Sequence, residues 1–435
     1  MTSITYKTAF VPGKKDHVAL LNHILRQDRW SDYLLYEGKD DIRIALNPLA
    51  RLELLRDGFC FRYADQVRVE KVSDPFKHAE RLLAGLPIQD WTAYGYVAFD
   101  VARYYLPYSK EIEDPLIAFL VPETELQLTA EGVSIRTMRD VDALQQLVAE
   151  ETARPMYEPS RISLSEENQN WYQHRVTALR QKIREGYLHK AILARSVTMP
   201  GQLDVLGTYA VGTQMNSRAR SYCFVLGQVR GVGFSPETLL EVDGGRSVLT
   251  NPLAGTRPRG STPDDDNALF NELFQDAKEV KEHAISIWLA QAEIASVCKP
   301  ESVRIFDFMN VQKYRCVQHL SSRVSGQLQS EKTTWDALKA LFPGITVSGV
   351  EKPAALEWID RLEEEPRGIY AGVLGWIDAA GAADFAIAIR SAYQYRKRIR
   401  VEAGAGIMAE SDPQKEYVES VNKMNTILHT LVLME

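Results

Sequence analysis

The sequence predicts an α+β fold with large antiparallel sheets. Up to about residue 150, short segments rich in β-branched and aromatic residues alternate with turns, as expected of strands. Farther along, strands mix with long helices without a regular strand–helix–strand repeat. Two pairs of expected strands are joined by tight turns at 243–245 and 396–398, as in antiparallel hairpins. This combination is typical of antiparallel sheets with separate helices, not of a doubly wound parallel sheet.

The N-terminal part, residues 1–160, is expected to consist mainly of strands. Amphipathic patterns at 76–84 and 141–151 predict two helices there. A polar stretch with two prolines, 154–160, is typical of a linker, but we expect 1–160 and the catalytic region 161–435 to form one integrated domain. The strands expected in the N-terminal part are 33–37, 42–45, 59–63, 94–99 and 117–121.

The second part, 161–435, is expected to begin with an amphipathic helix that ends at Gly186. One long helix is expected over 263–297. A last helix is expected from Asp412 and Pro413, a cap and a first-turn proline, to the end of the chain. The strands expected in this part are 190–195, 222–226, 239–242, 247–250, 385–395 and 399–403.

Charge and composition exclude several classes of function. The 435 residues include 51 Lys and Arg and 58 Asp and Glu, for a formal net charge of −7, so we expect no nucleic-acid partner. Apolar runs are far shorter than the roughly 20 residues that a membrane span needs, so we expect no membrane partner. With no secretion leader and no CxxC pair among four cysteines, we expect a cytoplasmic protein with free thiols. P-loop, Rossmann, Gly-x-Ser-x-Gly and His-Glu-x-x-His motifs are absent, which disfavours nucleotide and zinc chemistry.

Two Glu-x-x-Glu pairs are the first candidate functional residues. Glu416 and Glu419, with Lys423, fall opposite the expected apolar stripe of the last helix, and Glu279 and Glu282 lie off the stripe of the middle helix. Each set fits a solvated helix face with i,i+4 charge pairing. Each also fits carboxylates that converge on one hard divalent cation such as Mg²⁺. The expected stripes are Val418, Val421, Met424, Leu428 and Leu431 in the last helix and Leu273, Val280, Ala284 and Ile287 in the middle helix.

A glycine-rich segment and an arginine form a candidate anion site. Gly404, Ala405 and Gly406 follow a strand, where their backbone N–H groups can approach a ligand closely, although the same pattern is common in ordinary turns. Arg390 ends the apolar segment 385–389, and a guanidinium that enters a buried sheet needs an anion. That anion is either a structural Asp or Glu or a substrate carboxylate.

Lys190, Glu237 and His319 are candidates for proton transfer. Lys190 opens an apolar strand directly after a helix end, where it is either an exposed strand-edge lysine or a base at the mouth of a site. Glu237 lies just past a strand and is a candidate acid of raised pKa. From its surroundings in the sequence, His319 is expected to be a hydrogen-bonded core histidine.

The segment 251–260, Asn-Pro-Leu-Ala-Gly-Thr-Arg-Pro-Arg-Gly, resembles the Pro-(Leu/Ile)-Ala-Gly-Thr-Arg signature of the chorismate-binding enzymes. This family includes the anthranilate, isochorismate, aminodeoxychorismate and salicylate synthases. The resemblance extends in order over about 165–432, with a less specific match at 95–100. It implies an anthranilate synthase-type α+β fold in which large antiparallel sheets and helices surround a central cleft. Further matching segments are 189–195, 233–237, 276–283, 318–320, 367–372, 388–391, 403–407 and 416–419.

Within the family, the sequence is most similar to the monofunctional salicylate synthases of siderophore pathways. Gly-Phe-Ser-Pro-Glu at 233–237 and Gln-His-Leu-Ser-Ser at 318–322 carry this similarity, and Ala254 stands where aminodeoxychorismate synthases have a nucleophilic lysine. The resemblance implies conversion of chorismate to isochorismate and then to salicylate and pyruvate, without a glutaminase subunit. Asn251 departs from the glutamate of salicylate synthases, and Thr-Val-Ser-Gly at 346–349 is similar to anthranilate synthases. Two alternatives therefore remain: an isochorismate synthase that releases isochorismate, and an anthranilate synthase-type component that uses ammonia.

The resemblance also implies roles for the candidate residues. Lys190 would be the base that activates water for attack on C2 of chorismate, and Glu237 would protonate the departing C4 hydroxyl. The resemblance implies that the substrate is bound by Gly255, Thr256, His319, Thr346, Tyr370, Arg390, Gly404, Ala405, Gly406 and Lys423.

A magnesium ion is the cofactor that the resemblance implies. It would lie between the ring carboxylate of chorismate and the two glutamate pairs, where bare carboxylates would repel an anionic substrate. Glu282 and Glu419 would be direct ligands, and Glu279 and Glu416 would bridge through water.

Overall fold

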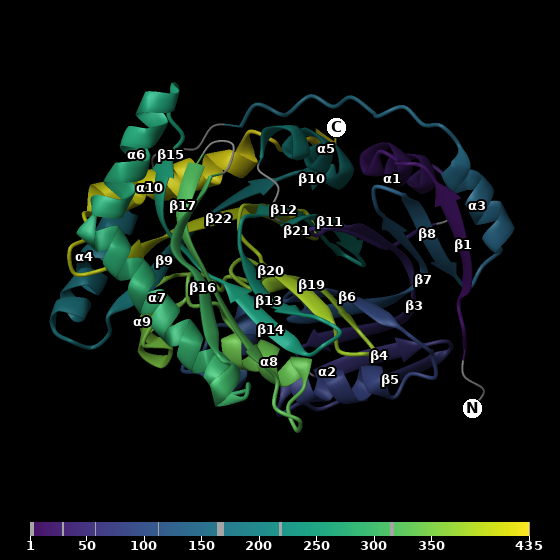
Figure 1. The fold of residues 1–435 in the computed structure, drawn as a ribbon, viewed down its shortest axis with the longest axis horizontal. Coiled ribbons are helices and arrows are strands. Elements are labelled where there is room, and N and C mark those ends of the chain that lie inside the picture. Colours follow the sequence, from purple (N-terminus) through teal and green to yellow (C-terminus); the bar gives the residue numbers. More distant parts are fainter. Residues whose placement is uncertain are drawn as a thin grey trace.

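The computed structural model describes residues 4–27, 30–56, 58–111, 113–162, 169–216, 220–313 and 317–434, and it confirms the predicted α+β fold. Twenty-one strands form one network of antiparallel pairings, and β10 (Gln202–Leu203) and β23 (Leu433–Met434) form a separate pair (Figure 1). In these parts of the chain, every helix is too short or too polar to cross a bilayer. Cys60, Cys223 and Cys298 are buried free thiols, and Cys316 lies outside the described residues.

The strand network runs in two directions from β7 (Ile117–Leu128), which pairs with β6 (Thr92–Val97) and with β3 (Ile42–Leu55). The first arm continues from β6 through β19 (Val373–Asp378), β20 (Ala383–Ile387), β13 (Thr238–Val242) and β14 (Ser247–Asn251) to β17 (Val317–Gln327), which also pairs with β15 (Leu253–Pro258) and β16 (Arg304–Lys313).

The second arm continues from β3 through β2 (Tyr33–Glu37), β11 (Arg220–Leu226), β12 (Val229–Ser235), β21 (Ser391–Tyr395), β22 (Arg398–Ile407) and β9 (Lys190–Pro200) to β18 (Gly349–Val350). Two pairs extend the network at its edges: β8 (Gly132–Thr137) with β1 (Lys7–Pro12), and β4 (Gly58–Tyr63) with β5 (Gln66–Glu70).

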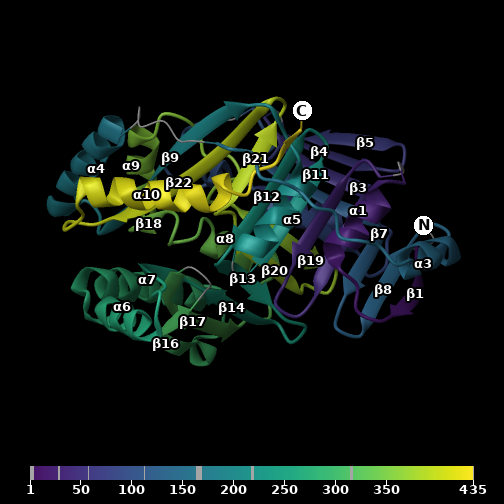
Figure 2. The same ribbon diagram turned by 90° about the horizontal axis from the view of Figure 1, so that it is seen from above.

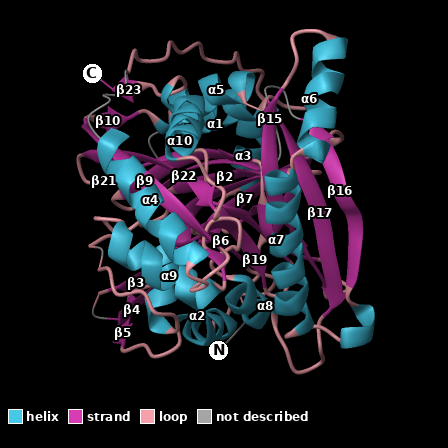
Figure 3. Ribbon diagram, turned by 90° about the vertical axis from the view of Figure 1, so that its left-hand side faces the viewer, coloured by secondary structure: helices cyan, strands magenta, loops and turns pink. Residues whose placement is uncertain are grey.

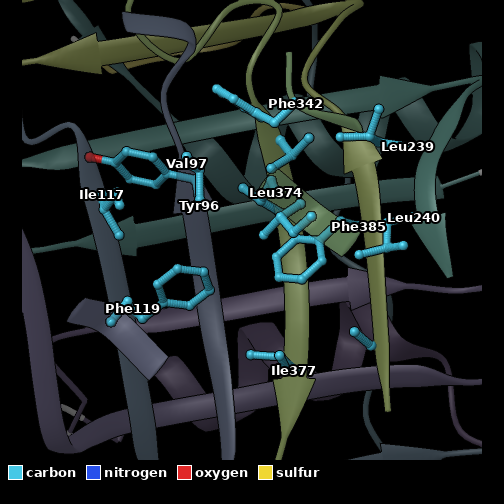
Figure 4. Close-up of a cluster of buried hydrophobic side chains, with 14 of the residues drawn as sticks. Tyr96, Val97, Ile117, Phe119, Leu239, Leu240, Phe342, Leu374, Ile377 and Phe385 are labelled. Carbon is cyan, nitrogen blue, oxygen red and sulfur yellow. The ribbon is translucent and has the colours of Figure 1, made fainter. Parts of the chain in front are cut away.

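An apolar core lies between the two arms. Tyr96 of β6 and Phe224 of β11 meet in it with their ring centroids 5.8 Å apart, and Figure 4 shows Tyr96 and Phe385 in this cluster. Strand β2 is buried on both faces: Leu34 belongs to this core and Leu35 to a second one. Because successive side chains of a strand point to opposite faces, the unbroken run of aromatic and apolar residues at 33–36 fits an interior strand.

The second core lies beneath four helices, α1 (His17–Leu25), α3 (Val141–Ala149), α5 (Val205–Met215) and α10 (Pro413–Leu428). Helix α10 packs on β22 and on α4 (Gln169–Arg184), whereas α7 (Ala277–Ala295) packs on β15 and β17. Figure 2 shows α7 and α10 in separate parts of the molecule, and Figure 3 shows α7 along the β15–β17 sheet. The remaining helices are α2 (Pro75–Ala84), α6 (Pro263–Gln275), α8 (Thr334–Leu341), α9 (Lys352–Leu362) and the 3₁₀ turns η1 (Phe99–Tyr104) and η2 (Pro300–Ser302).

The prediction of a single helix over 263–297 is wrong, because Asp276 divides this segment into α6 and α7. The Asp276 carboxylate accepts hydrogen bonds from the backbone N–H groups of Lys278 (3.0 Å) and Glu279 (3.2 Å). An aspartate that caps the next helix in this way leaves the helical conformation itself. The break places Lys278 and Glu279 in the first turn of α7.

Other expected boundaries also differ from those in the structure. The strand over 385–395 breaks at Arg390, whose φ of 52° turns the chain, so β20 and β21 pair with different strands. The last helix ends at Leu428 and is followed by β23. Strand β6 ends at Val97, and the segment 403–407 lies within β22 instead of forming a turn.

The apolar stripes expected for α7 and α10 are also wrong in part. Val418 is 43% exposed, whereas Glu416 is 2% and Glu282 8% exposed. Each helix packs on a sheet along one side and faces a cavity along another, so the side expected to meet solvent is buried as well.

Candidate active site

A cavity between α7 and α10 brings together most of the candidate residues. Its wall includes Glu237 from the turn between β12 and β13, Glu279 and Glu282 from α7, and Glu419 and Lys423 from α10. Figure 2 shows how residues so distant in sequence meet, since α7 lies with β16 and β17 and α10 lies with β9 and β22. Other candidate residues in the wall are Gly255, Thr256, His319, Thr346, Tyr370, Arg390, Gly404 and Gly406.

Lys190 is buried at the acidic end of this cavity. It is the first residue of β9, with 1% of its surface exposed, so it is not an exposed strand-edge lysine. Its Nζ lies 2.8 Å from Glu282 Oε1 and 3.3 Å from Ser286 Oγ. Gly406 on the neighbouring strand leaves the space that this pair occupies, because a Cβ there would lie 2.5 Å from Glu282 Oε1 and 3.3 Å from Lys190 Cε.

Glu237 is a buried carboxyl with a raised pKa. Its Oε1 accepts a hydrogen bond from the backbone N–H of Leu253 (3.1 Å) and one from the Thr346 hydroxyl. Burial raises the pKa of Glu237 to about 7, while these two hydrogen bonds and the charge of Lys190 act in the opposite direction. At neutral pH this carboxyl is therefore protonated in a large share of the molecules, as a general acid requires.

The two glutamate pairs face each other across the cavity and are held by lysines. Lys278 Nζ lies 3.4 Å from Glu279 Oε1 and 3.2 Å from Glu416 Oε1, and so links α7 to α10. Lys423 Nζ lies 2.6 Å from Glu419 Oε1. Burial and the neighbouring carboxylates raise the pKa of Glu279, and burial raises that of Glu416 to about 7. The cluster thus contains three lysines, Lys190, Lys278 and Lys423, against four glutamates.

The donor set of this cluster fits a hard divalent cation. It consists of carboxylates on two facing helices, the ligand type that Mg²⁺ prefers, and Glu416 Oε2 is buried without a hydrogen-bond partner among the described residues. As the side chains stand, however, no three His, Cys, Asp or Glu residues within the described ranges are arranged to hold a metal ion.

Arg390 supplies positive charge at another part of the wall. It makes no ion pair with any residue that the structure describes, and burial lowers its pKa although Glu419 and Tyr370 act to raise it. A half-buried guanidinium on the wall of a cavity, without a carboxylate partner among the described residues, favours an anionic ligand. Nearby, His319 Nδ1 lies 2.9 Å from Thr256 Oγ1, and burial lowers the pKa of His319 to about 3, so its ring is neutral.

Three candidates, Lys190, Ala405 and Glu416, lie outside the wall itself, and two other residues of the site had no role assigned from sequence. Ala405 points away from the cavity into the core beneath α4, because side chains alternate along β22, and Glu416 lies behind Lys278. Lys278 and Ser286 were not assigned as candidates. The position of Lys278 directly before Glu279 in a first helical turn was the available signal, whereas the position of Ser286 depends on the packing of α7 against β9.

Comparisons with known proteins found relatives that match most of the chain. The sequence profile of the chorismate binding enzymes matches residues 32–429. The chain is 33% identical over 429 residues to a salicylate synthase of Mycolicibacterium paratuberculosis, covering 96% of this chain and 93% of that protein. It is 41% identical over 268 residues to an anthranilate synthase component 1 of Haloarcula marismortui, covering 61% of this chain and 50% of that protein.

Solved structures show the same fold. Anthranilate synthase component I of Streptococcus pneumoniae superposes with a TM-score of 0.77 at 27% identity, over 90% of this chain and 93% of that one. The menaquinone-specific isochorismate synthase of Escherichia coli superposes with a TM-score of 0.75 at 19% identity, over 98% of this chain and 95% of that one. The matched profile spans both arms of the sheet and the whole cavity. The chain therefore belongs to the chorismate binding enzymes and is a chorismate-utilising enzyme.

Proposed function

We propose that this enzyme is a Mg²⁺-dependent salicylate synthase, which converts chorismate to isochorismate and then to salicylate and pyruvate. One observation carries the proposal: a carboxyl that retains its proton near neutral pH, Glu237, lines the same cavity as Arg390 and as Glu282, whose carboxylate contacts the buried Lys190. The likeness to a salicylate synthase over nearly the whole chain supports this choice among the activities of the family.

The first step exchanges a hydroxyl between two ring carbons. In its uncharged form, Lys190 Nζ accepts a proton from a water molecule, whose oxygen bonds to C2 of chorismate. Glu237 donates its proton to the C4 oxygen, which leaves as water while the ring double bonds shift. The raised pKa of Glu237, about 7, supports its role as the donor. Each of these proton transfers contributes about 10²–10⁴-fold to the rate.

Magnesium would be held by the facing glutamates. In this proposal Glu282 and Glu419 bind it directly, and Glu279 and Glu416 bind it through water. When bound, the ion supplies the positive charge that lets the ring carboxylate of chorismate approach an acidic wall. The chain's own contribution is to place four carboxylates of two helices around one end of the cavity, next to Lys190.

The second step releases pyruvate from isochorismate. The hydrogen on C2 moves to the enolpyruvyl methylene as the ether bond breaks, so the step needs no acid or base from the protein. Its requirement is a folded side chain held close to the ring. Arg390 and Tyr370 would hold the enolpyruvyl carboxylate, and the neutral His319 with Thr256 would line the ring. In this proposal the enzyme works in the cytoplasm without a glutaminase subunit and supplies salicylate for siderophores.

A product assay tests the proposal. We expect chorismate and Mg²⁺ to give salicylate with equimolar pyruvate, no product without Mg²⁺, and no change on adding ammonium salts or glutamine. Accumulation of isochorismate without pyruvate would refute the second step. Anthranilate formed with ammonium would instead favour an anthranilate synthase-type component, the second candidate, which the 41% identity to the Haloarcula marismortui protein supports.

A further inference from the structure

Lys278 occupies the space between the two glutamate pairs. It lies in the first turn of α7, and its side chain crosses to α10, with Nζ 3.4 Å from Glu279 Oε1 and 3.2 Å from Glu416 Oε1. Its ammonium thus lies between one glutamate of each pair and offsets part of their negative charge.

Two other lysines in the cluster are held by groups outside it. Lys190 Nζ also contacts Ser286 Oγ at 3.3 Å, and Lys423 Nζ donates to the backbone carbonyl of Gly404 at 2.9 Å. The hydrogen bonds found for Lys278 Nζ within the described chain go to two members of the cluster itself. Its side chain is 23% exposed, so the flexible stem has a path to solvent. Lys278 is the cluster lysine best placed to withdraw.

We propose that Lys278 is a built-in counter-cation, which holds the two glutamate pairs together while no metal is bound and withdraws when a divalent cation binds. The inference rests on the proposed function, which places Mg²⁺ among these glutamates. The ammonium of Lys278 lies beside Glu279 and Glu416, the two glutamates that would hold the ion through water, and its positive charge repels a dication brought to the same cluster. Lys278 thereby reduces the repulsion among the four carboxylates when no metal is bound, and it lowers the affinity of the cluster for metal.

The arrangement of the side chains supports this competition. No three acidic side chains in the described ranges are grouped as metal ligands, while Lys278 contacts one glutamate of each pair. Glu416 Oε2 is buried without a partner among the described residues, so Lys278 satisfies one oxygen of that carboxylate and leaves the other free for a ligand. Movement of one lysine side chain would free Glu279 and Glu416 together.

Metal binding to a Lys278→Met variant tests the inference directly. Methionine keeps the length of the side chain and removes the charge. The matched control is Lys281→Met, one turn along the same helix, where Lys281 is exposed and pairs with Glu410 at 3.4 Å outside the cavity. Mn²⁺ is titrated into each protein without chorismate, and free Mn²⁺ is counted by electron paramagnetic resonance. We expect the Kd of Lys278→Met to fall at least about tenfold, and that of Lys281→Met to match wild type, since tenfold corresponds to only about 1.4 kcal/mol.

Thermal unfolding gives a second readout that needs no activity. Without metal, Lys278→Met is expected to have a lower Tm than wild type, because four carboxylates face one another with fewer cations. Saturating Mg²⁺ is expected to raise the Tm of this variant more than that of wild type or Lys281→Met, since tighter binding to the folded state stabilises it more. Lys278→Gln, which keeps a hydrogen-bond donor without charge, repeats both measurements if the methionine variant does not fold.

Each outcome decides the inference. If wild type binds Mn²⁺ and the neutral variants bind it equally or more weakly, Lys278 does not compete with metal and the inference is overturned. That result leaves the proposed function untouched, because the product assay tests the function separately. If neither wild type nor the variants bind Mn²⁺, the inference fails together with the metal site. Tighter binding by both neutral variants and an unchanged control would support it.

Discussion

The hydrogen bond from Thr346 to Glu237 provides a test of the general acid through the pH dependence of the reaction. Thr346 Oγ1 donates to Glu237 Oε1, and this contact lowers the pKa of a carboxyl that burial raises to about 7. A donor to a carboxylate stabilises its charged form. Thr346→Val removes the donor and preserves the shape of the side chain, so the pKa of Glu237 is expected to rise. The acid then retains its proton to a higher pH.

The size of the shift follows from the energy of one hydrogen bond. A hydrogen bond to a charged group contributes roughly 1.5–3 kcal/mol, and one pKa unit corresponds to about 1.36 kcal/mol. The full effect is about one to two units. The backbone N–H of Leu253 remains on the same oxygen at 3.1 Å and compensates for part of the loss, so we expect a shift of about one unit.

The assay is the pH profile of kcat/KM for chorismate consumption. For wild type we expect kcat/KM to fall as pH rises through about 7, because Glu237 loses its proton there. For Thr346→Val the fall should begin about one unit higher, whatever the change in the maximal rate. Thr346→Ser, which keeps the hydroxyl, is the control and should retain the wild-type profile. An unmoved alkaline limb in Thr346→Val, or an equal shift in Thr346→Ser, would refute the assignment of Glu237 as the acid that this hydroxyl tunes.

Three further substitutions test the site and the fold. Lys190→Gln should reduce formation of isochorismate at least about 10²-fold while the protein stays folded by circular dichroism, and near-normal turnover would exclude Lys190 as the base. Gly406→Ala should strongly reduce the initial rate, because its Cβ would lie 2.5 Å from Glu282 Oε1; an unaffected rate would show that this carboxylate is free to move. Arg367→Met leaves the buried Glu363, now 2.6 Å from Arg367, without its partner, and should cost about 3–5 kcal/mol in urea unfolding. A loss below about 1 kcal/mol would mean that Glu363 finds another partner or becomes protonated.

The fold class was predictable because its signals are local. The aromatic and apolar run at 33–36 and the hairpin turn at 243–245 specify a strand and a chain reversal over a few residues, and the structure has β2 at the first place and the β13–β14 hairpin at the second. The break at Arg390 was not predictable in the same way. Its backbone conformation, with φ of 52°, is one that a non-glycine residue adopts only where surrounding contacts impose it.

The candidate site was predictable as a set of residues but not as an arrangement. The ordered motifs identified Lys190, Glu237, the two glutamate pairs and Arg390, and most of these line one cavity. Helical periodicity placed Glu416 on a solvated face, and the structure buries it to 2% exposure. Periodicity reports which side chains share a face of a helix, and it carries no information about what packs against that face.

Short-range physics in the chain is thus enough for many of the strands and turns and for the start of α10, but not for the break between α6 and α7. The pairing of Lys278 with Glu416, 138 positions later in the chain, depends on how α7 and α10 are held by different sheets. The burial that raises the pKa of Glu237 likewise depends on residues contributed by separate segments, such as Leu253 and Thr346. Desolvation and charge coupling act through space, so they exist only once distant segments have packed together.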